Sequence, residues 1–164
     1  MTGSSRALRA LTLAVALLGL TGCNPGGRDA VTPQTQSTLA PYPADMEHLD
    51  DILALSKMEL PENVDEVTVE PAYEFERGYP RGWGYVVYFT ADEAITRQFL
   101  SDYVRIILPE AEDYPDCDPE LAEKDLPVAE VNRPICASAS TGTGNARVLV
   151  ERPFGRVWIL IRGE

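Results

Sequence analysis

Hydrophobic side chains in residues 45–60 recur at intervals of three and four, which is the spacing of one face of an α-helix. The side chains at this spacing are Met46, Leu49, Ile52 and Leu53. Asp45 stands in the N-cap position, where a short acidic side chain accepts a hydrogen bond from the first turn, and Pro61 marks the end. The pattern predicts that the folded part of the chain begins near Asp45 with this helix.

The next stretch changes to a period of two. In residues 66–76 apolar side chains alternate with glutamate and threonine, which predicts a strand with one face in water. The apolar set is Val67, Val69, Tyr73 and Phe75. Pro71 interrupts the run and has no N–H to donate, so we expect an edge strand or a bulge. Residues 83–90 predict a second strand, joined to the first in a hairpin.

A helical period returns in residues 90–104. Thr90 and Glu93 stand three residues apart, which is the spacing of a capping box at a helix start. Ile95, Phe99 and Tyr103 then share one face. We expect a second helix that ends before Pro109.

The C-terminal part contains three further runs of strand character, residues 135–140, 146–151 and 156–163, with turn compositions between them. Residues 157–161 are apolar on both faces of a strand, which predicts a central strand covered on both sides. Short connections favour antiparallel neighbours. The chain therefore predicts an α+β fold, in which an antiparallel sheet of about five strands carries two helices on one face.

The beginning of the chain has a different character. Arg6 and Arg9 precede an apolar run, residues 10–20, and no acidic residue lies among them. This is the layout of a secretory signal peptide. As a helix the run would span about 16 Å, roughly half the hydrocarbon core of a bilayer, so it is too short for a transmembrane span. We therefore expect residues 1–22 to be a signal segment outside the fold.

The end of this segment, Leu20-Thr21-Gly22-Cys23, resembles the lipobox of bacterial lipoproteins. In that family the cysteine receives a diacylglyceryl group, and a signal peptidase cuts just before it. The resemblance covers residues 1–23 and implies a mature protein that begins at a lipid-modified Cys23 on the extracytoplasmic face of the cell membrane. The alternatives are an ordinary cleaved signal, or a hydrophobic helix that happens to end in Gly-Cys.

The chain has three cysteines: Cys23, Cys117 and Cys136. An odd count in an exported protein leaves one thiol to explain. With lipid on Cys23, the other two can pair, and closing a loop of about 20 residues would stabilise the fold by roughly 3 kcal/mol. The alternative is two free thiols. Neither has a histidine or a further cysteine near it, which argues against a metal site.

Residues 24–44 are rich in proline, glycine, threonine and glutamine, so we expect a flexible tether over residues 23–44 and a single domain over residues 45–164. Residues 109–134 are acidic and irregular, and we expect the cysteine pair to pin them. The formal net charge of −12 argues against nucleic acid and anionic lipid headgroups as partners, because both are negatively charged.

Motifs for catalysis or metal binding are weak. The one histidine is His48. A Ser–His–Asp site would need a G-x-S-x-G nucleophile elbow, and the chain has none, so we expect His48 on the solvent side of the first helix. Residues 113–120 faintly resemble a calcium loop, but Leu121 stands where an EF-hand needs glycine, and we interpret them as a solvated acidic loop. Residues 141–145 predict a hairpin turn rather than a phosphate cradle. We expect no metal and no cofactor.

Aromatic side chains gather between Tyr73 and Phe89. Near the turn, Tyr79, Arg81 and Trp83 have the composition of a protein or glycan contact. The first hypothesis is therefore a non-enzymatic binding or interaction module with its contact surface there.

Two other hypotheses remain. One is a small enzyme acting on the cell wall, or an inhibitor or accessory subunit of an enzyme, which requires a deep pocket with convergent carboxylates of perturbed pKa. The other is a spacer or assembly subunit. A strand that ends in Tyr88-Phe89-Thr90 before a capped helix is also similar to small actinobacterial lipoproteins of unknown function, a resemblance that implies no activity.

Overall fold

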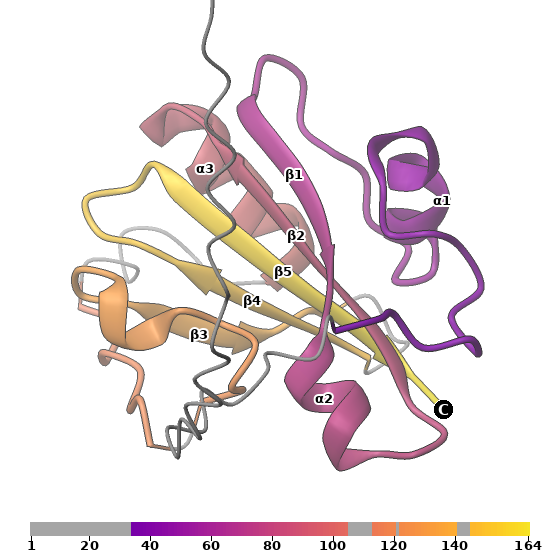
Figure 1. The fold of residues 1–164 in the computed structure, drawn as a ribbon. Helices are drawn as coiled ribbons and strands as arrows, with labels where there is room; N and C mark the ends of the chain where they lie inside the picture. The colour runs from indigo at the N-terminus through magenta and orange to yellow at the C-terminus, as the bar shows by residue number, and fades with distance from the viewer. Residues whose placement is uncertain (1–33, 105–112, 121, 141–144) are drawn as a thin grey trace, which may run out of the picture. The chain divides into compact units, whose positions relative to one another are not determined.

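The computed structural model describes residues 34–104, 113–120, 122–140 and 145–164, and over these ranges it contains a five-stranded antiparallel sheet. The strands are β1 (Asp65–Pro71), β2 (Trp83–Thr90), β3 (Ile135–Ser138), β4 (Ala146–Val150) and β5 (Arg156–Gly163). Their order across the sheet is β1-β2-β5-β4-β3 (Figure 1). The predicted α+β fold with an antiparallel sheet is therefore confirmed.

The helical elements are short. They are the 3₁₀ turn η1 (Met46–His48), α1 (Leu49–Ala54), α2 (Tyr73–Gly78), α3 (Glu93–Phe99), the π-helical turn η2 (Leu100–Val104) and the 3₁₀ turn η3 (Val128–Glu130). Isolated helices of fewer than about 12 residues are marginal in water, so these depend on packing. Within the described ranges, no helix has the length and apolarity that crossing a membrane requires.

Strand β5 lies at the centre of the sheet, between β2 and β4 (Figure 1). Ile159 of β5 pairs with Val87 on one side and with Val148 on the other. Residues 157–161 are all buried, and their alternate side chains belong to two different hydrophobic clusters. The prediction of a central strand covered on both faces is confirmed.

The first face of the sheet packs against α1, α3 and η2. Its strand side chains include Tyr85, Val87 and Phe89, which alternate along β2. The helical side chains packed with them are Leu49, Ile52, Leu53, Phe99, Leu100 and Val104. Both predicted helices therefore cover one face of the sheet, as their apolar spacing indicates.

The second face carries its own hydrophobic cluster. The members are Ala72, Phe75, Leu126, Val128, Val131, Leu149, Trp158 and Leu160. Phe75 comes from α2, while Leu126, Val128 and Val131 come from the segment that precedes β3. The predicted fold placed both helices on the first face and named no element for this one, which α2 and this segment cover as a further layer.

The first helix is shorter than predicted. Asp45 does cap it, since its side chain accepts a hydrogen bond from the backbone N–H of His48 at 3.1 Å. The α-helix ends at Ala54 instead of near Pro61, and Met46 is 52% exposed instead of buried. Met46 lies in the 3₁₀ turn η1, which departs from the 3.6-residue period on which the prediction rests.

The second half of the predicted first strand is a helix. Strand β1 ends at Pro71, and Tyr73 and Phe75 lie in α2. The carboxylate of Asp125 accepts hydrogen bonds from the backbone N–H groups of Glu74 and Phe75, both at 2.8 Å. This cap comes from a residue about 50 positions away, so no local pattern could reveal it.

Strand β1 is an edge strand, which is one of the two outcomes expected from Pro71, and it carries a bulge at its other end. The register shifts between the pairs Asp65–Thr90 and Thr68–Tyr88, and Glu66 at this shift has a positive φ of 52°. The outward side chains Glu66 and Glu70 are exposed. The predicted antiparallel pairing of β1 and β2 is confirmed, although α2 lies in the connection.

The second predicted helix begins two residues later than the capping box indicates. Thr90 belongs to β2, and Asp92 is the N-cap, because its side chain accepts a hydrogen bond from the backbone N–H of Ile95 at 2.9 Å. Phe99 is buried as predicted, while Ile95 and Tyr103 are half-buried.

The fold begins before Asp45. The phenol of Tyr85 accepts a hydrogen bond from the backbone N–H of Tyr42 and donates one to its carbonyl, at 2.9 and 2.8 Å. The backbone N–H of Ser37 donates to the Glu76 carboxylate at 2.8 Å. The tether prediction is therefore wrong for residues 34–44. Backbone hydrogen bonds attach them to the domain, and no hydrophobic period in the sequence indicates this. Residues 1–33 lie outside the described residues.

Candidate functional site

Cys117 and Cys136 form a disulfide, with their Cα atoms 5.3 Å apart. The backbone N–H of Cys117 also donates to the carbonyl of Pro134 at 2.8 Å. Residues 113–120, which we call the acidic segment, therefore run beside the start of β3. The disulfide therefore ties the acidic segment to the edge of the sheet.

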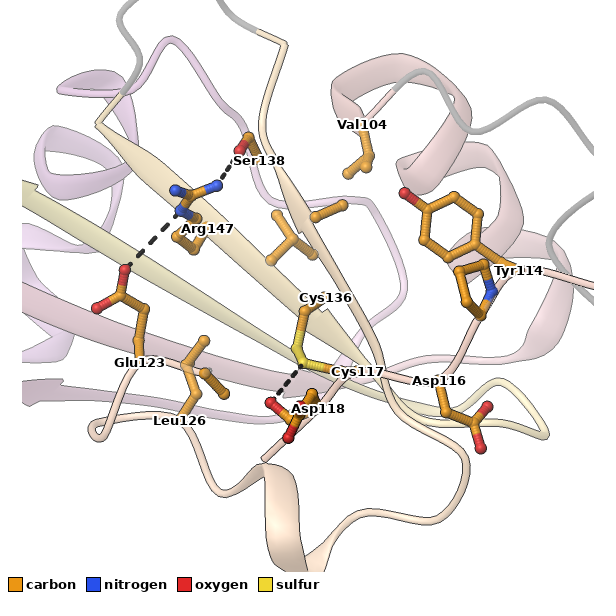
Figure 2. Close-up of a pocket in the computed structure, with 14 residues that line it drawn as sticks. Val104, Tyr114, Asp116, Cys117, Asp118, Glu123, Leu126, Cys136, Ser138 and Arg147 are labelled. Carbon is orange, nitrogen blue, oxygen red and sulfur yellow. Dashed lines mark hydrogen bonds and ion pairs between the residues drawn. A yellow bond between two sulfur atoms is a disulfide. The ribbon is translucent and has the colours of Figure 1, made fainter. Parts of the chain in front are cut away.

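A cavity of about 580 Å³ lies beside this disulfide. Its lining includes Val104, Leu126, Cys136, Val148, Glu123 and Arg147. Figure 2 shows Glu123 and Arg147 on one side of the disulfide, and Val104 and Tyr114 on the other. The cavity thus combines apolar walls with the charged side chains of Glu123 and Arg147 and, elsewhere in its lining, those of Asp116 and Asp118.

Glu123 and Arg147 in this cavity belong to ion pairs. Arg147 donates to the hydroxyl of Ser138, and its Nε lies 3.9 Å from Oε1 of Glu123 (Figure 2). The same Glu123 oxygen accepts a hydrogen bond from Arg162 at 2.7 Å. These contacts leave Glu123 engaged with two guanidinium groups, so it is poorly placed to move a proton.

A buried arginine holds the outer wall of the cavity. Arg152 is 1% exposed, and its guanidinium donates to the carbonyls of Tyr114 and Arg133 at 2.7 and 2.8 Å. It also pairs with the carboxylate of Asp116. The acidic segment is therefore attached to the body of the domain by a buried cation as well as by the disulfide.

The weak calcium motif does not form a ligand cluster. Asp116 pairs with Arg152, and the Asp118 carboxylate accepts the backbone N–H of Glu120 at 2.9 Å. Over the part of the chain that the structure describes, no three acidic, histidine or cysteine side chains converge as metal ligands.

His48 forms a local pair with the residue that caps its own turn. Its Nδ1 lies 2.7 Å from Oδ1 of Asp45, and this hydrogen bond raises the pKa of His48 and lowers the pKa of Asp45. The pair is lost as the pH rises through the raised pKa of His48, or falls through the lowered pKa of Asp45. His48 stacks on Tyr42, so it has a structural explanation at the surface.

The three residues predicted as an interaction surface differ in their exposure. Tyr79 is 51% exposed and stacks on Phe75, with ring centroids 4.6 Å apart. Trp83 is half-buried and lies 5.7 Å from the ring of Tyr85, in the cluster of the first face. Arg81, between them in sequence, is exposed. The structure therefore leaves Tyr79 and Arg81 at the surface and turns Trp83 partly into the core.

A second cavity, which we call the aromatic groove, lies on the second face of the sheet and has a volume of about 490 Å³. Residues from β1, β2, β5 and α2 contribute to it. The rings and charged groups that line it include Tyr73, Tyr88, Trp158, Glu70, Glu74 and Arg156. The groove is not apparent from the sequence, because its rings come from three separate elements, α2, β2 and β5.

The register of the sheet explains how the rings of the groove meet. Tyr88 of β2 pairs with Trp158 of β5, and their ring centroids lie 5.0 Å apart. The guanidinium carbon of Arg156 lies 5.3 Å from the Trp158 ring centroid, while two of its nitrogens contact Glu151 at 2.6 Å. The groove thus holds one arginine between a ring and a carboxylate.

The acidic groups of the groove differ in their surroundings. Glu70 is exposed, whereas burial raises the pKa of Asp125 against the lowering effect of the two backbone N–H groups that it accepts. Burial, together with the nearby Glu66 carboxylate, raises the pKa of Tyr88. Glu70 is therefore the carboxylate best placed to meet an incoming group.

The chain matches no protein-family model, no curated protein and no solved structure. The geometry of the described residues therefore carries the argument for its function. The one sequence signal that could have found the groove is the outward side of β2 and β5, where strand alternation places Tyr88 and Trp158 on the face opposite the two predicted helices.

Proposed function

We propose that the protein is a lipid-anchored extracytoplasmic lipoprotein that works as a non-enzymatic binding module, and that its binding site is the aromatic groove. The observation that carries the binding role is the groove itself, in which rings and an exposed carboxylate line an open cavity of about 490 Å³. Tyrosine, tryptophan and arginine side chains supply much of the energy in protein recognition sites.

The alternative of an enzyme has less support from the acidic groups. Burial raises the pKa of two carboxyl groups, Glu76 and Asp125. Each accepts two backbone N–H groups, Glu76 from Ser37 and Gly84, and Asp125 at the start of α2. A general acid or base must be free to exchange a proton with substrate, whereas these carboxylates hold the chain in place.

The anchor is proposed from the lipobox at Leu20–Cys23. Removal of residues 1–22 would remove Arg6 and Arg9 and take the formal charge from −12 to −14. A diacylglyceryl group carries two acyl chains, which suffice for stable anchoring where one is marginal. The Cys117–Cys136 disulfide agrees with an oxidising compartment outside the cytoplasm.

The anchor is tested by mass spectrometry of the mature protein. We expect the N-terminal residue to be Cys23 carrying a diacylglyceryl group, because the thiol is the acceptor in lipoproteins. Cys23→Ala should abolish both the lipid mass and the cleavage before residue 23. An unmodified N-terminus at any other residue would contradict the anchor and leave the proposal for the groove standing.

The binding role is tested by photo-crosslinking in intact cells. We expect benzoylphenylalanine in place of Tyr88, a half-buried ring in the groove, to form an adduct with a protein or a glycan. The same probe in place of Glu47, which is exposed on η1, serves as the matched control and should form none. Absence of an adduct at position 88, with both variants equally abundant, would count against a binding role for the groove.

A further inference from the structure

We propose that the aromatic groove binds a lysine-bearing basic segment of a protein partner, an inference that rests on the proposed binding role and names the chemistry of its ligand. The partner would place an ammonium group beside Glu70 and over the ring of Tyr88. The exposed Glu70 carboxylate, the negative charge of the groove and the packing around the Trp158 ring each support a basic ligand.

The charge balance of the groove is negative. Its lining includes the carboxylates of Glu70, Glu74 and Asp125, and one cation, Arg156. Arg156 is already neutralised by a two-point contact with Glu151. Glu66, whose carboxylate lies 3.3 Å from the phenol oxygen of Tyr88, adds a further acid at the rim. A ligand that enters this groove is therefore favoured when it is cationic.

Glu70 has the freedom that a binding carboxylate needs. It is exposed on β1, and within the described residues it has no ion-pair partner. Glu74 is held more loosely than the capping Asp125, since its one ion pair is a surface contact of 2.8 Å with Arg77. Exposed pairs of this kind are weak, so Glu74 can turn toward a competing cation.

Arg156 shows how a cation is held against these rings. Its guanidinium lies over the indole of Trp158 while its nitrogens contact the carboxylate of Glu151. This pairing of a ring with a carboxylate is the combination by which proteins bind ammonium and guanidinium groups. Tyr88 and Glu70 offer a second ring and a second carboxylate next to it.

A neutral glycan fits the same surface less well. Sugars stack on an exposed aromatic face, but Trp158 is only 9% exposed. Tyr88 and Arg156 both pack against its ring, at 5.0 and 5.3 Å. The indole therefore offers no open platform, whereas an ammonium group needs only the half-buried ring of Tyr88 and a nearby carboxylate.

The test uses fluorescein-labelled heptalysine and the full-length protein in a non-ionic detergent, with binding followed by fluorescence anisotropy. Heptaglutamate controls for the sign of the charge, and chitohexaose serves as the neutral glycan. The chain has two tryptophans, so Trp83→Phe leaves Trp158 as a single reporter inside the groove. Heptalysine should change the emission of Trp158 in this background.

Matched charge variants separate the groove from the net charge of the protein. We expect Glu70→Gln with Glu74→Gln to weaken heptalysine binding by roughly tenfold. Glu47→Gln with Asp50→Asn removes the same number of charges from η1 and from α1, of which α1 packs on the first face of the sheet. This control pair should weaken binding less than about twofold, since exposed charges beyond a Debye length are largely screened.

Three results would overturn the inference. Equal weakening by the two variant pairs would mean that heptalysine senses only net charge. A change in Trp158 emission with chitohexaose and none with heptalysine would assign the groove to glycan, and the binding role would stand. If neither heptalysine nor chitohexaose changes the emission of Trp158, the inference of a basic ligand is wrong. The photo-crosslinking experiment at position 88 tests the binding role of the groove independently.

Discussion

Replacing Arg152 with methionine should lower the free energy of unfolding by about 3 kcal/mol. The guanidinium is buried, and it donates to the carbonyls of Tyr114 and Arg133 while it pairs with Asp116. Methionine fills much of the same volume but donates nothing, so two carbonyls lose their donors in a site with little access to water. Urea denaturation with the disulfide intact measures the loss.

Two further variants make this result specific. Arg152→Lys keeps the charge but not the planar fork of donors, so it should lose less stability than methionine and still fall below the wild type. Arg77→Met removes an arginine that is 61% exposed and whose ion-pair partner within the described residues is Glu74, and it should change stability by less than about 0.5 kcal/mol. A loss below about 1 kcal/mol for Arg152→Met would mean that water replaces the guanidinium.

Removing the disulfide should cost a similar amount. Cys117→Ser with Cys136→Ser opens a link between residues 19 positions apart, and the chain-entropy account gives roughly 3 kcal/mol for a loop of this length. The denaturation midpoint of this double variant should match that of the reduced wild-type protein. Unchanged stability on reduction would show that the hydrogen bonds of Arg152 suffice to hold the acidic segment.

The two effects should not add, because both act on the same segment. Once the disulfide is absent, residues 113–118 can leave the body of the domain, and Arg152 then loses partners that it would otherwise keep. A double-mutant cycle should therefore give a coupling free energy of about 1 kcal/mol. Additivity within about 0.3 kcal/mol would indicate two independent attachments.

Much of the sheet could be predicted because its signals are local. Alternation in residues 83–90 places Tyr85, Val87 and Phe89 on one face, and the structure buries all three there. The apolar run at residues 157–161 requires cover on both sides, and β5 is the central strand. The order of residues along a strand determines which side chains share a face, so the period-two pattern is sufficient to predict which of them are buried.

The elements that sequence analysis missed depend on contacts between distant residues. Helix α2 is capped by Asp125, and residues 34–44 are held through Tyr85 and Glu76. Gly84 makes the approach of α2 possible, since a Cβ there would lie 2.7 Å from the Cβ of Ala72. Alternation in residues 73–76 favoured a strand, and these tertiary contacts override that local preference.

The aromatic groove could not be predicted from the sequence for the same reason. The predicted interaction surface of Tyr79, Arg81 and Trp83 lies within one turn of the chain, whereas the aromatic groove joins Tyr88 with Trp158, 70 positions later. Strand register brings these two rings together, and register between β2 and β5 cannot be read from either strand alone.

Strand edges decide whether a β-protein aggregates when it is crowded. At one edge, β1 has a bulge, a terminal proline and the exposed acids Glu66 and Glu70. At the other, backbone hydrogen bonds flank β3 at both ends: the N–H of Cys117 donates to the carbonyl of Pro134, and the N–H of Ser140 donates to the carbonyl of Tyr103 in η2. Neither edge presents a long, flat ladder to another copy. We therefore expect the domain to stay as separate molecules even when it is concentrated.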